Sequence, residues 1–288
     1  NLAVAVRDSF NNPVPNIDVT FTVPLSGPSA TFSGGVNTAR TNGLGIATAV
    51  QLTANTIAGG PYPVTPSVQG VSSPASFSLR NNPGPSASII AIEGTPQSAR
   101  VLTPFAARFR VRVGDEFGNP VVLGTTVTFT PPSSGASGSF SGANTATTDS
   151  LGFAVANQFT ANSVAGGPYT LNARVDGVAA QAAFSLTNTA AAAATVTASA
   201  GTPQSTTVGT VFTIPLQAFV SDVSGNPVPN VIVTFTSPPE PGASCSFGVF
   251  AGVGTATTNA SGHANLVAIA NTVAGSYNVS VTATGASP

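Results

Sequence analysis

The sequence predicts an all-β chain of three tandem β-sandwiches, and three observations support this prediction. One turn-and-strand motif occurs three times, beginning at Asn12, Asn119 and Asn226 with equal spacing between copies. Glycine and proline number 30 and 24, which suits many turns between short strands. The longest alanine run, at 190–194, is shorter than the roughly 12 residues that an isolated helix needs. Because each repeat is long enough for its own set of strands, we expect separate domains rather than the coils of a solenoid.

The repeated motif is a turn followed by one strand. In the third copy Asn226 and Pro227 open the motif, and the residue before a proline is biased toward extended backbone. Apolar and polar residues then alternate with a period of two, which places one set of side chains on the core face of a strand. The inward pairs predicted in this way are Val19 and Phe21, Val127 and Phe129, and Val233 and Phe235.

Further landmarks recur at the same spacing and set the limits of the repeats. Phe-Ser-Leu occurs at 77–79 and 184–186, and Gly-Thr-Pro-Gln-Ser at 94–98 and 201–205. We therefore expect domains at 1–82, 83–189 and 190–288, the first lacking its N-terminal strand and the third its C-terminal strand. The connecting segments, 81–85 and 187–194, are short, which predicts that neighbouring domains touch and form a stiff rod.

The middle repeat contains seven or so short strands with turn residues between them. They are expected near 86–92, 105–113, 125–130, 153–160, 169–175 and 182–187, with a short pair around 138–141 and 145–148. This number and spacing are typical of a Greek-key sandwich of the immunoglobulin kind. The missing helices exclude a doubly wound α/β fold.

Each repeat carries Ala-Gly followed shortly by a tyrosine at the start of a strand. These tyrosines, Tyr62, Tyr169 and Tyr277, resemble the tyrosine corner of immunoglobulin-like domains, in which the hydroxyl bonds nearby backbone. The residue two places further on is Val64, Leu171 or Val279, where an antibody domain has cysteine.

The whole chain is therefore similar to the tandem bacterial Ig-like repeats of invasin/intimin-type adhesins and other large surface or secreted proteins. The likeness is carried by Asp-Val-Ser-Gly-Asn-Pro-Val-Pro at 222–229, Thr-Ala-Thr-Thr at 255–258 and the Ala-Gly-x-Tyr corner. It implies a non-catalytic extracellular or cell-surface segment, structural or adhesive, that forms a stalk or filament. The implied partners are neighbouring repeats, copies of the chain, or a glycan or host-surface ligand.

Two other functions are compatible with the same module, because a fold does not fix a function. One is an Ig-like module of a phage or virion surface, and the other is an accessory domain of a secreted enzyme that acts on polysaccharides. The sequence neighbouring this segment would separate the three.

Composition excludes several classes of partner. The charged residues are eight arginines and nine acids, with no lysine, so the net charge of −1 offers no basic surface for nucleic acid. No apolar run approaches the ~20 residues of a membrane span. Cys245 is the single cysteine, which excludes an intrachain disulfide and a multi-thiolate metal site and favours a small packed residue near a strand.

The sequence lacks the combinations of residues that catalysis requires. His263 is the single histidine, and it stands where the other repeats have Ile46 and Phe153, which indicates a variant strand residue. No paired carboxylates recur by repeat, so general acid–base and nucleophilic schemes have no candidates. We predict a non-enzyme without a cofactor.

Asp8, Asp115 and Asp222 recur just before the Asn-Pro turns. Calcium needs six to eight oxygen ligands with several carboxylates, and each repeat has too few acids close together. The favoured role is turn capping, in which the carboxylate bonds backbone two residues on. No metal site is expected.

Arg108, Arg110 and Arg112 alternate with apolar residues, which places three guanidinium groups on the outer face of one strand. One explanation is a solvated face that prevents sheets from sticking together. The other is a contact patch for an acidic glycan or a neighbouring subunit. We favour the solvated face.

The two incomplete sandwiches leave open strand edges. One explanation is that the sequence is the ordered part of a longer chain. The other is strand addition from neighbouring subunits, with a foreign strand beside 2–6 or beside 277–283.

Overall fold

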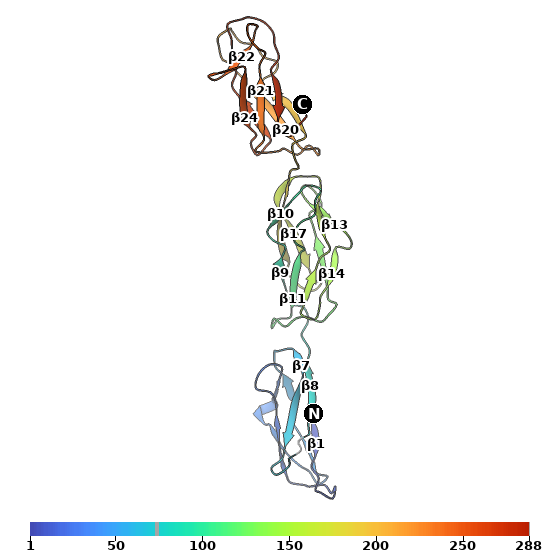
Figure 1. Cartoon of the computed structure of the whole chain (residues 1–288). Helices are drawn as coiled ribbons and strands as arrows, with labels where there is room; N and C mark the ends of the chain where they lie inside the picture. The colour runs from blue at the N-terminus through green and yellow to red at the C-terminus, as the bar shows by residue number, and fades with distance from the viewer. Residues whose placement is uncertain (73–74, 288) are drawn as a thin grey trace.

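The structure, a computed structural model, describes residues 1–72 and 75–287 and consists of three separate sandwiches arranged end to end (Figure 1). Its regular elements are β-strands, apart from one 3-10 turn at Ser33–Gly35. In the described residues no sheet contains strands from two repeats. The predicted all-β fold is confirmed.

The described residues of the first repeat form eight strands in three sheets. They are β1 (Ala3–Ala5), β2 (Asp18–Thr22), β3 (Ala30–Phe32), β4 (Thr38–Arg40), β5 (Ile46–Thr48), β6 (Leu52–Ala54), β7 (Gly59–Ser67) and β8 (Phe77–Asn81). The largest sheet has the order β4-β2-β7-β8, and β1-β5 and β3-β6 form the two smaller ones.

The middle repeat contains ten strands. They are β9 (Ser88–Glu93), β10 (Gln97–Arg100), β11 (Arg110–Gly114), β12 (Thr126–Thr130), β13 (Gly138–Phe140), β14 (Thr145–Thr147), β15 (Phe153–Val155), β16 (Phe159–Ala161), β17 (Gly166–Arg174) and β18 (Ala182–Thr189). A five-stranded sheet, β10-β18-β17-β12-β14, faces the strands of β15-β11-β9 and β13-β16 across the core.

As far as residue 287, the third repeat forms nine strands. They are β19 (Thr195–Ala200), β20 (Leu216–Ser221), β21 (Ile232–Thr236), β22 (Cys245–Phe247), β23 (Phe250–Ala251), β24 (Val253–Thr257), β25 (His263–Leu266), β26 (Ile269–Ala270) and β27 (Ser280–Ala283). Their sheets have the orders β19-β20-β25, β24-β21-β27 and β23-β22-β26.

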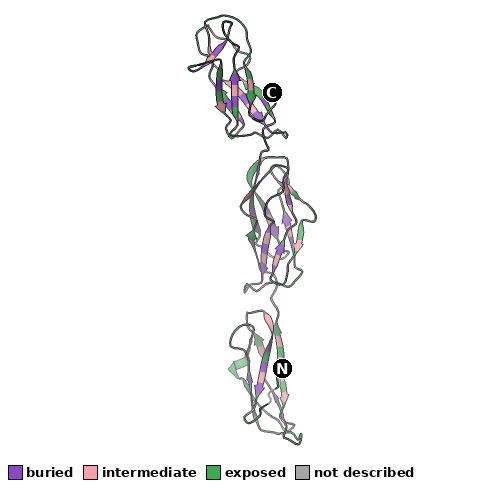
Figure 2. Ribbon diagram, viewed as in Figure 1, coloured by how far each residue is buried: buried purple, intermediate pink, exposed green. Residues whose placement is uncertain are grey.

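Each repeat has its own apolar core, and Figure 2 shows buried residues along the strands of all three bodies. The six side chains predicted to face inward are at most 1% exposed. Cores that are separate in this way are expected when each repeat buries its own strand faces.

The strand pattern of the middle repeat corrects the prediction in three places. The strand expected at 153–160 is two strands, because its two halves have different partners. β15 pairs with β11, and the chain then crosses to the neighbouring sheet, where β16 pairs with β13. The strand expected from 105 begins at Arg110, because the backbone N–H and C=O of Ala107 bond the side chain of Gln97 instead. Strand β10 was not predicted at all, and it is held by parallel pairing with β18.

Two edges differ between the repeats. Within the described residues β1 pairs only with β5, whereas its counterpart β11 pairs with both β15 and β9. Similarly, β27 pairs only with β21 there, whereas β17 pairs with both β12 and β18. The positions of β9 and β18 therefore have no counterpart strand in the first and third repeats respectively, in the part of the chain described.

Candidate functional site: the joints between repeats

The turn after β11 is organised by one carboxylate. Asp115 Oδ1 accepts the backbone N–H groups of Phe117 and Asn119, both at 2.9 Å. Its Oδ2 accepts the amide of Asn119, also at 2.9 Å. The same contact to the residue two places on occurs at Asp8 and Asp222, at 2.9 Å each. The predicted turn-capping role is confirmed, and its further effect is to fix the Asn119 side chain.

Asn119 joins the first repeat to the middle one. Its Nδ2 donates to the carbonyl of Thr56 at 2.8 Å, and its Oδ1 accepts the N–H of Ala58 at 2.9 Å. Both partners lie in the loop between β6 and β7. The N–H of Gly84, in the connecting segment, donates to Asp115 Oδ2 at 3.0 Å. One side-chain pair therefore holds the loop of the preceding repeat and the connecting segment together.

The second joint repeats the first, contact for contact. Asn226 donates to the carbonyl of Ser163 and accepts the N–H of Ala165, both at 2.8 Å. The N–H of Ala191 donates to Asp222 Oδ2 at 2.9 Å. The two connecting segments differ in sequence, yet the geometry is the same because both bind through a backbone N–H.

Burial distinguishes the aspartates in the joints from the one outside them. Asp115 and Asp222 are each 2% exposed, whereas Asp8 is exposed. Burial alone would raise the pKa of Asp115, but hydrogen bonds from the Asn119 amide and three backbone N–H groups outweigh it and lower the pKa below 3.8. Asp222 has a lowered pKa through the same balance. Both carboxylates are therefore charged and fully hydrogen-bonded within the joints.

The tyrosine corner positions the loop that enters the joint. Tyr62 Oη donates to Asn81 Oδ1 at 2.9 Å, and Asn81 Nδ2 donates to Asn55 Oδ1 at 3.0 Å and to the carbonyl of Ile57 at 3.2 Å. The expected partner, nearby backbone, was wrong: the hydroxyl bonds a side chain on the next strand. Tyr169 repeats the arrangement with Asn188 at 2.9 Å.

Tyr277 has no such partner. Its hydroxyl is buried and makes no hydrogen bond within the described residues. Burial, and after it the neighbouring Cys245 thiol, raise the pKa of Tyr277 to about 12. Burial also raises the pKa of Tyr169 to about 12, but that hydroxyl is hydrogen-bonded.

The arginines lie as the alternation predicted, on the outer side of a strand whose inner residues Phe109, Val111 and Val113 are 0% exposed. Arg110 contacts Glu93 at 3.0 Å, and its guanidinium carbon lies 4.1 Å from the centre of the Phe153 ring. Arg112 donates to the carbonyl of Gly118 at 2.9 Å. Arg108 precedes β11 and is exposed. Two of the three cations are thus already engaged within the chain.

His263 lies on a strand and Cys245 is a buried strand residue, as the sequence indicated. The His263 ring lies on β25 with its centre 5.1 Å from that of Phe219. Cys245 is 3% exposed on β22. Within residues 1–72 and 75–287 no group of three or more His, Cys, Asp or Glu could hold a metal ion. No helix in this part of the chain is long and apolar enough to cross a membrane.

The bridging role of Asn119 and Asn226 was not predicted from the sequence. Both were identified as the first residue of a turn, but their partners across the joint are backbone groups, which leave no mark in a sequence. The available signal was the repeated spacing of four residues between Asp and Asn, seen also in Asp8 and Asn12.

Comparisons with known proteins give matches among solved structures only: no family model and no curated protein matches this chain. Similar structures include the D0-D1 domain of intimin, with 25% identity, 63% of this chain and 87% of that chain covered, and a TM-score of 0.26. Invasin, titled a bacterial integrin-binding protein, shows 20% identity over 98% of this chain with a TM-score of 0.45, and this chain covers 52% of it. Domains 4–9 of the surface layer protein SbsC show 17% identity over 98% of this chain and 40% of that one, with a TM-score of 0.31. Intimin and invasin are the adhesins whose repeats the sequence motifs resemble.

Proposed function

We propose that this chain is a non-catalytic structural or adhesive segment of an extracellular bacterial surface protein, and that it serves as a stiff rod of Ig-like domains at 1–82, 83–189 and 190–288. The observation that carries the proposal is the joint: the same three hydrogen bonds recur at both boundaries. Domains joined only by a flexible linker need not share the same hydrogen bonds at each boundary.

The joint is suited to stiffness because one planar amide makes two of its bonds. Asn119 donates to one backbone group and accepts from another two residues away, which fixes both the position and the rotation of the loop it holds. Each hydrogen bond contributes about 0.5–1.5 kcal/mol net, so three contribute roughly 2–4 kcal/mol per joint. That favours the closed joint by a factor of roughly 30 or more.

The stiffness can be measured by spin-label distances across each joint. Thr38, Thr145 and Thr255 are exposed and lie at equivalent places on the edge strands β4, β14 and β24. In a Cys245→Ala background, Thr38→Cys with Thr145→Cys reports on the first joint, and Thr145→Cys with Thr255→Cys on the second. We expect one narrow distance distribution for each pair.

Asn119→Ala should broaden the first distribution and leave the second unchanged, and Asn226→Ala should do the reverse. Asn12→Ala is the matched control, because Asn12 makes the same turn contacts with Asp8 but lies in neither joint. Broad distributions in the wild-type chain, or narrow ones in both joint variants, would refute the rod.

We further propose that the chain associates end to end with repeats of its own type. The observation in favour is the hydrogen-bonded pair of Asp8 and Asn12 on the first repeat. This pair has the same contacts as Asp115 and Asn119 in the first joint, and both of its residues are exposed. The loop between β26 and β27 of the third repeat carries Thr272 and Ala274 where the receiving loop of the first joint has Thr56 and Ala58, and that of the second has Ser163 and Ala165. Sedimentation velocity over a range of concentrations should show reversible association that Asn12→Ala weakens. A wild-type chain that stays monomeric at high concentration would contradict this proposal without affecting the rod.

A further inference from the structure

The outer face of the sheet β15-β11-β9, in the middle repeat, carries both cations and exposed apolar side chains. On β9, Ile89 is buried and Ile90 is 52% exposed, and on β15, Ala154 is buried and Val155 is 46% exposed. Because neighbouring residues of a strand point to opposite faces, Ile90 and Val155 lie on the outer face. In register, Val155 is opposite Arg110, and Ile90 is opposite Arg112. The set is called the arginine face here and consists of Arg108, Arg110, Arg112, Ile90, Phe153 and Val155.

The same positions differ in the other two repeats. The counterparts of Arg110 and its partner Val155 are Ala3 and Thr48 in the first repeat, and Gln217 and Asn265 in the third. In the third repeat the two side chains satisfy each other, because Gln217 Nε2 donates to Asn265 Oδ1 at 2.9 Å. Small or mutually bonded polar side chains are therefore enough to keep such a face solvated. Exposed isoleucine and valine beside three cations are not needed for that, so the structure favours the contact patch over the solvated face that the sequence alone favoured.

The charge of the face indicates an anionic partner. Arg110 is already paired with Glu93 at 3.0 Å, so within the fold it covers the sheet. Arg108 and Arg112 form no ion pair within residues 1–72 and 75–287, and Glu116 in the next turn pairs with neither. Two guanidinium groups are thus left to contact an anion, and the planar guanidinium is suited to two parallel hydrogen bonds with a carboxylate or a similar oxyanion.

The size of the face argues against a folded protein as the partner. Strands lie about 4.8 Å apart and rise about 3.3 Å per residue, so three strands over the five residues of β11 cover roughly 250 Å². A stable protein interface buries about 800 Å² on each partner. The face is therefore too small for a second protein and wide enough for a single extended polymer.

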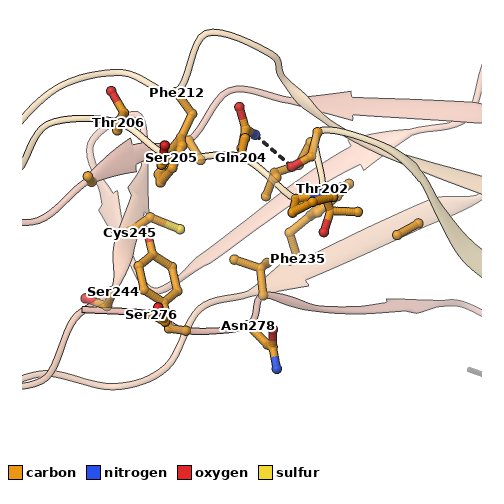
Figure 3. A pocket seen from close by; sticks show the side chains of 18 of the residues that line it. Thr202, Gln204, Ser205, Thr206, Phe212, Phe235, Ser244, Cys245, Ser276 and Asn278 are labelled. Carbon is orange, nitrogen blue, oxygen red and sulfur yellow. Dashed lines mark hydrogen bonds between the residues drawn. The ribbon is translucent and has the colours of Figure 1, made fainter. Parts of the chain in front are cut away.

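The shape of the face argues against a small ligand and against a peptide. Small molecules bind in concave sites, such as the cavity of about 470 Å³ against Phe235 and Cys245 in the third repeat (Figure 3). The arginine face is open sheet. Extended peptides dock on sheet edges or in grooves with side-chain pockets, whereas a sugar ring presents a flat C–H surface that packs on exposed aliphatic side chains.

We propose that the arginine face binds a linear acidic polysaccharide that lies along β11. Carboxylate or sulfate groups of the polymer contact Arg108 and Arg112, and the C–H faces of its rings pack on Ile90 and Val155. The inference is separate from the rod: within the described chain the hydrogen bonds of Arg110 and Arg112 stay inside the middle repeat, so failure of this proposal leaves the rod untouched.

The test uses the whole chain labelled with nitrogen-15 and follows the Nε–Hε signals of its eight arginines by NMR, each assigned by substitution. One arm adds oligogalacturonate, whose anions are carboxylates, and a second adds a heparin-derived oligosaccharide, which also carries sulfates. A neutral maltooligosaccharide of the same length is the control. We expect the signals of Arg108 and Arg112 to shift saturably in at least one acidic arm, and the arm that binds more tightly identifies the anion. The signals of Arg7 and Arg174 should stay in place, and the neutral sugar should move none.

Variants separate this contact from general attraction between charges. Arg108→Gln and Arg112→Gln should each weaken binding by about three- to tenfold, the effect of losing one exposed charge-assisted hydrogen bond. The matched control is Arg174→Gln, which removes the same charge from an exposed residue of β17 in the other sheet and should leave the affinity unchanged. Val155→Thr keeps the charge and the branched shape but makes the surface polar, and it should weaken binding about two- to threefold. Circular dichroism and melting should be the same for all four variants, since the replaced residues are not buried.

The proposal is overturned if neither acidic oligosaccharide moves Arg108 and Arg112, or if Arg174→Gln weakens binding as much as the two face variants do. Equal affinity for polyglutamate or for single-stranded DNA would also overturn it, because the face would then select charge alone and not a sugar. An affinity that Val155→Thr leaves unchanged would count against the apolar part of the contact in the same way.

Discussion

Replacing Phe129 with alanine should destabilise the middle repeat by about 3–5 kcal/mol and leave the other two repeats intact. Phe129 is 0% exposed on β12, and its ring centre lies 6.1 Å from that of Phe140 and 6.3 Å from that of Phe184. The substitution therefore removes a fully buried side chain and two aromatic contacts, each of which contributes about 0.5–1.5 kcal/mol. Those contacts place the expected loss in the upper part of the range.

The change should stay local because no sheet in the described residues spans two repeats. For a domain of about 100 residues, a loss of 3 kcal/mol lowers the melting temperature by about 12 °C or more. Differential scanning calorimetry should show one transition moving by this amount. Hydrogen exchange read by mass spectrometry should show faster exchange in β12 and β17 and unchanged exchange in β2 and β21.

The matched control is Thr128→Ala, which alters the next residue of the same strand on its half-exposed face. It should change the stability of the middle repeat by less than about 1 kcal/mol. A Phe129→Ala chain with wild-type melting would refute the predicted inward face. Equal acceleration of exchange in all three repeats would refute the independence of the cores.

Two further predictions concern charge. As the pH falls below 3.8, protonation of Asp115 and Asp222 should loosen both joints: their folded-state pKa values are lowered, so the stabilisation is present above the unfolded value and is lost as the pH falls through the folded one. The spin-label distances should then broaden only in acid, and broadening already near neutral pH would contradict the assignment. Arg110→Ala should lower the free energy of unfolding by no more than about 1 kcal/mol in chemical denaturation, because its partner Glu93 is 58% exposed. A larger loss would show that these arginines do more than cover the sheet.

The fold could be predicted from the sequence wherever a local signal decides the structure. Alternation over 231–236 is enough to place Val233 and Phe235 in the core. Strand β10 could not be predicted in this way. Its four residues have no apolar alternation, and it exists because β18, far along the chain, supplies a parallel partner.

The candidate site likewise contains local contacts that the sequence predicts and long-range contacts that it does not. The capping contact of Asp115 spans two residues and follows from the chemistry of aspartate in turns. The bridge from Asn119 spans 61 and 63 residues and ends on backbone groups, whose identity is the same in every sequence. The partner of Tyr62 lies between these cases: an asparagine follows 19 residues later, and the same separation recurs after Tyr169. Because this separation is the same in both repeats, the asparagine partner could have been predicted from the sequence in place of a backbone partner.

The chemistry of the joints leads to a last prediction, on salt. With 6% charged residues the chain offers few ion pairs, and the described joints contain none: they are built from an amide, backbone groups and a buried carboxylate. Salt at 1 M shortens the Debye length to about 3 Å and weakens exposed charge pairs, but it has little effect on hydrogen bonds between an uncharged amide and backbone groups or to a buried carboxylate. The spin-label distances across both joints should therefore keep their width from low salt to 1 M sodium chloride. The Asp18–Arg40 pair, at 4.0 Å and exposed, is an internal reference that salt should loosen under the same conditions. If the distance distributions across the joints broaden when that pair loosens, the joints depend on surface charge. The hydrogen bonds of Asn119 and Asn226 would then not be what holds the rod.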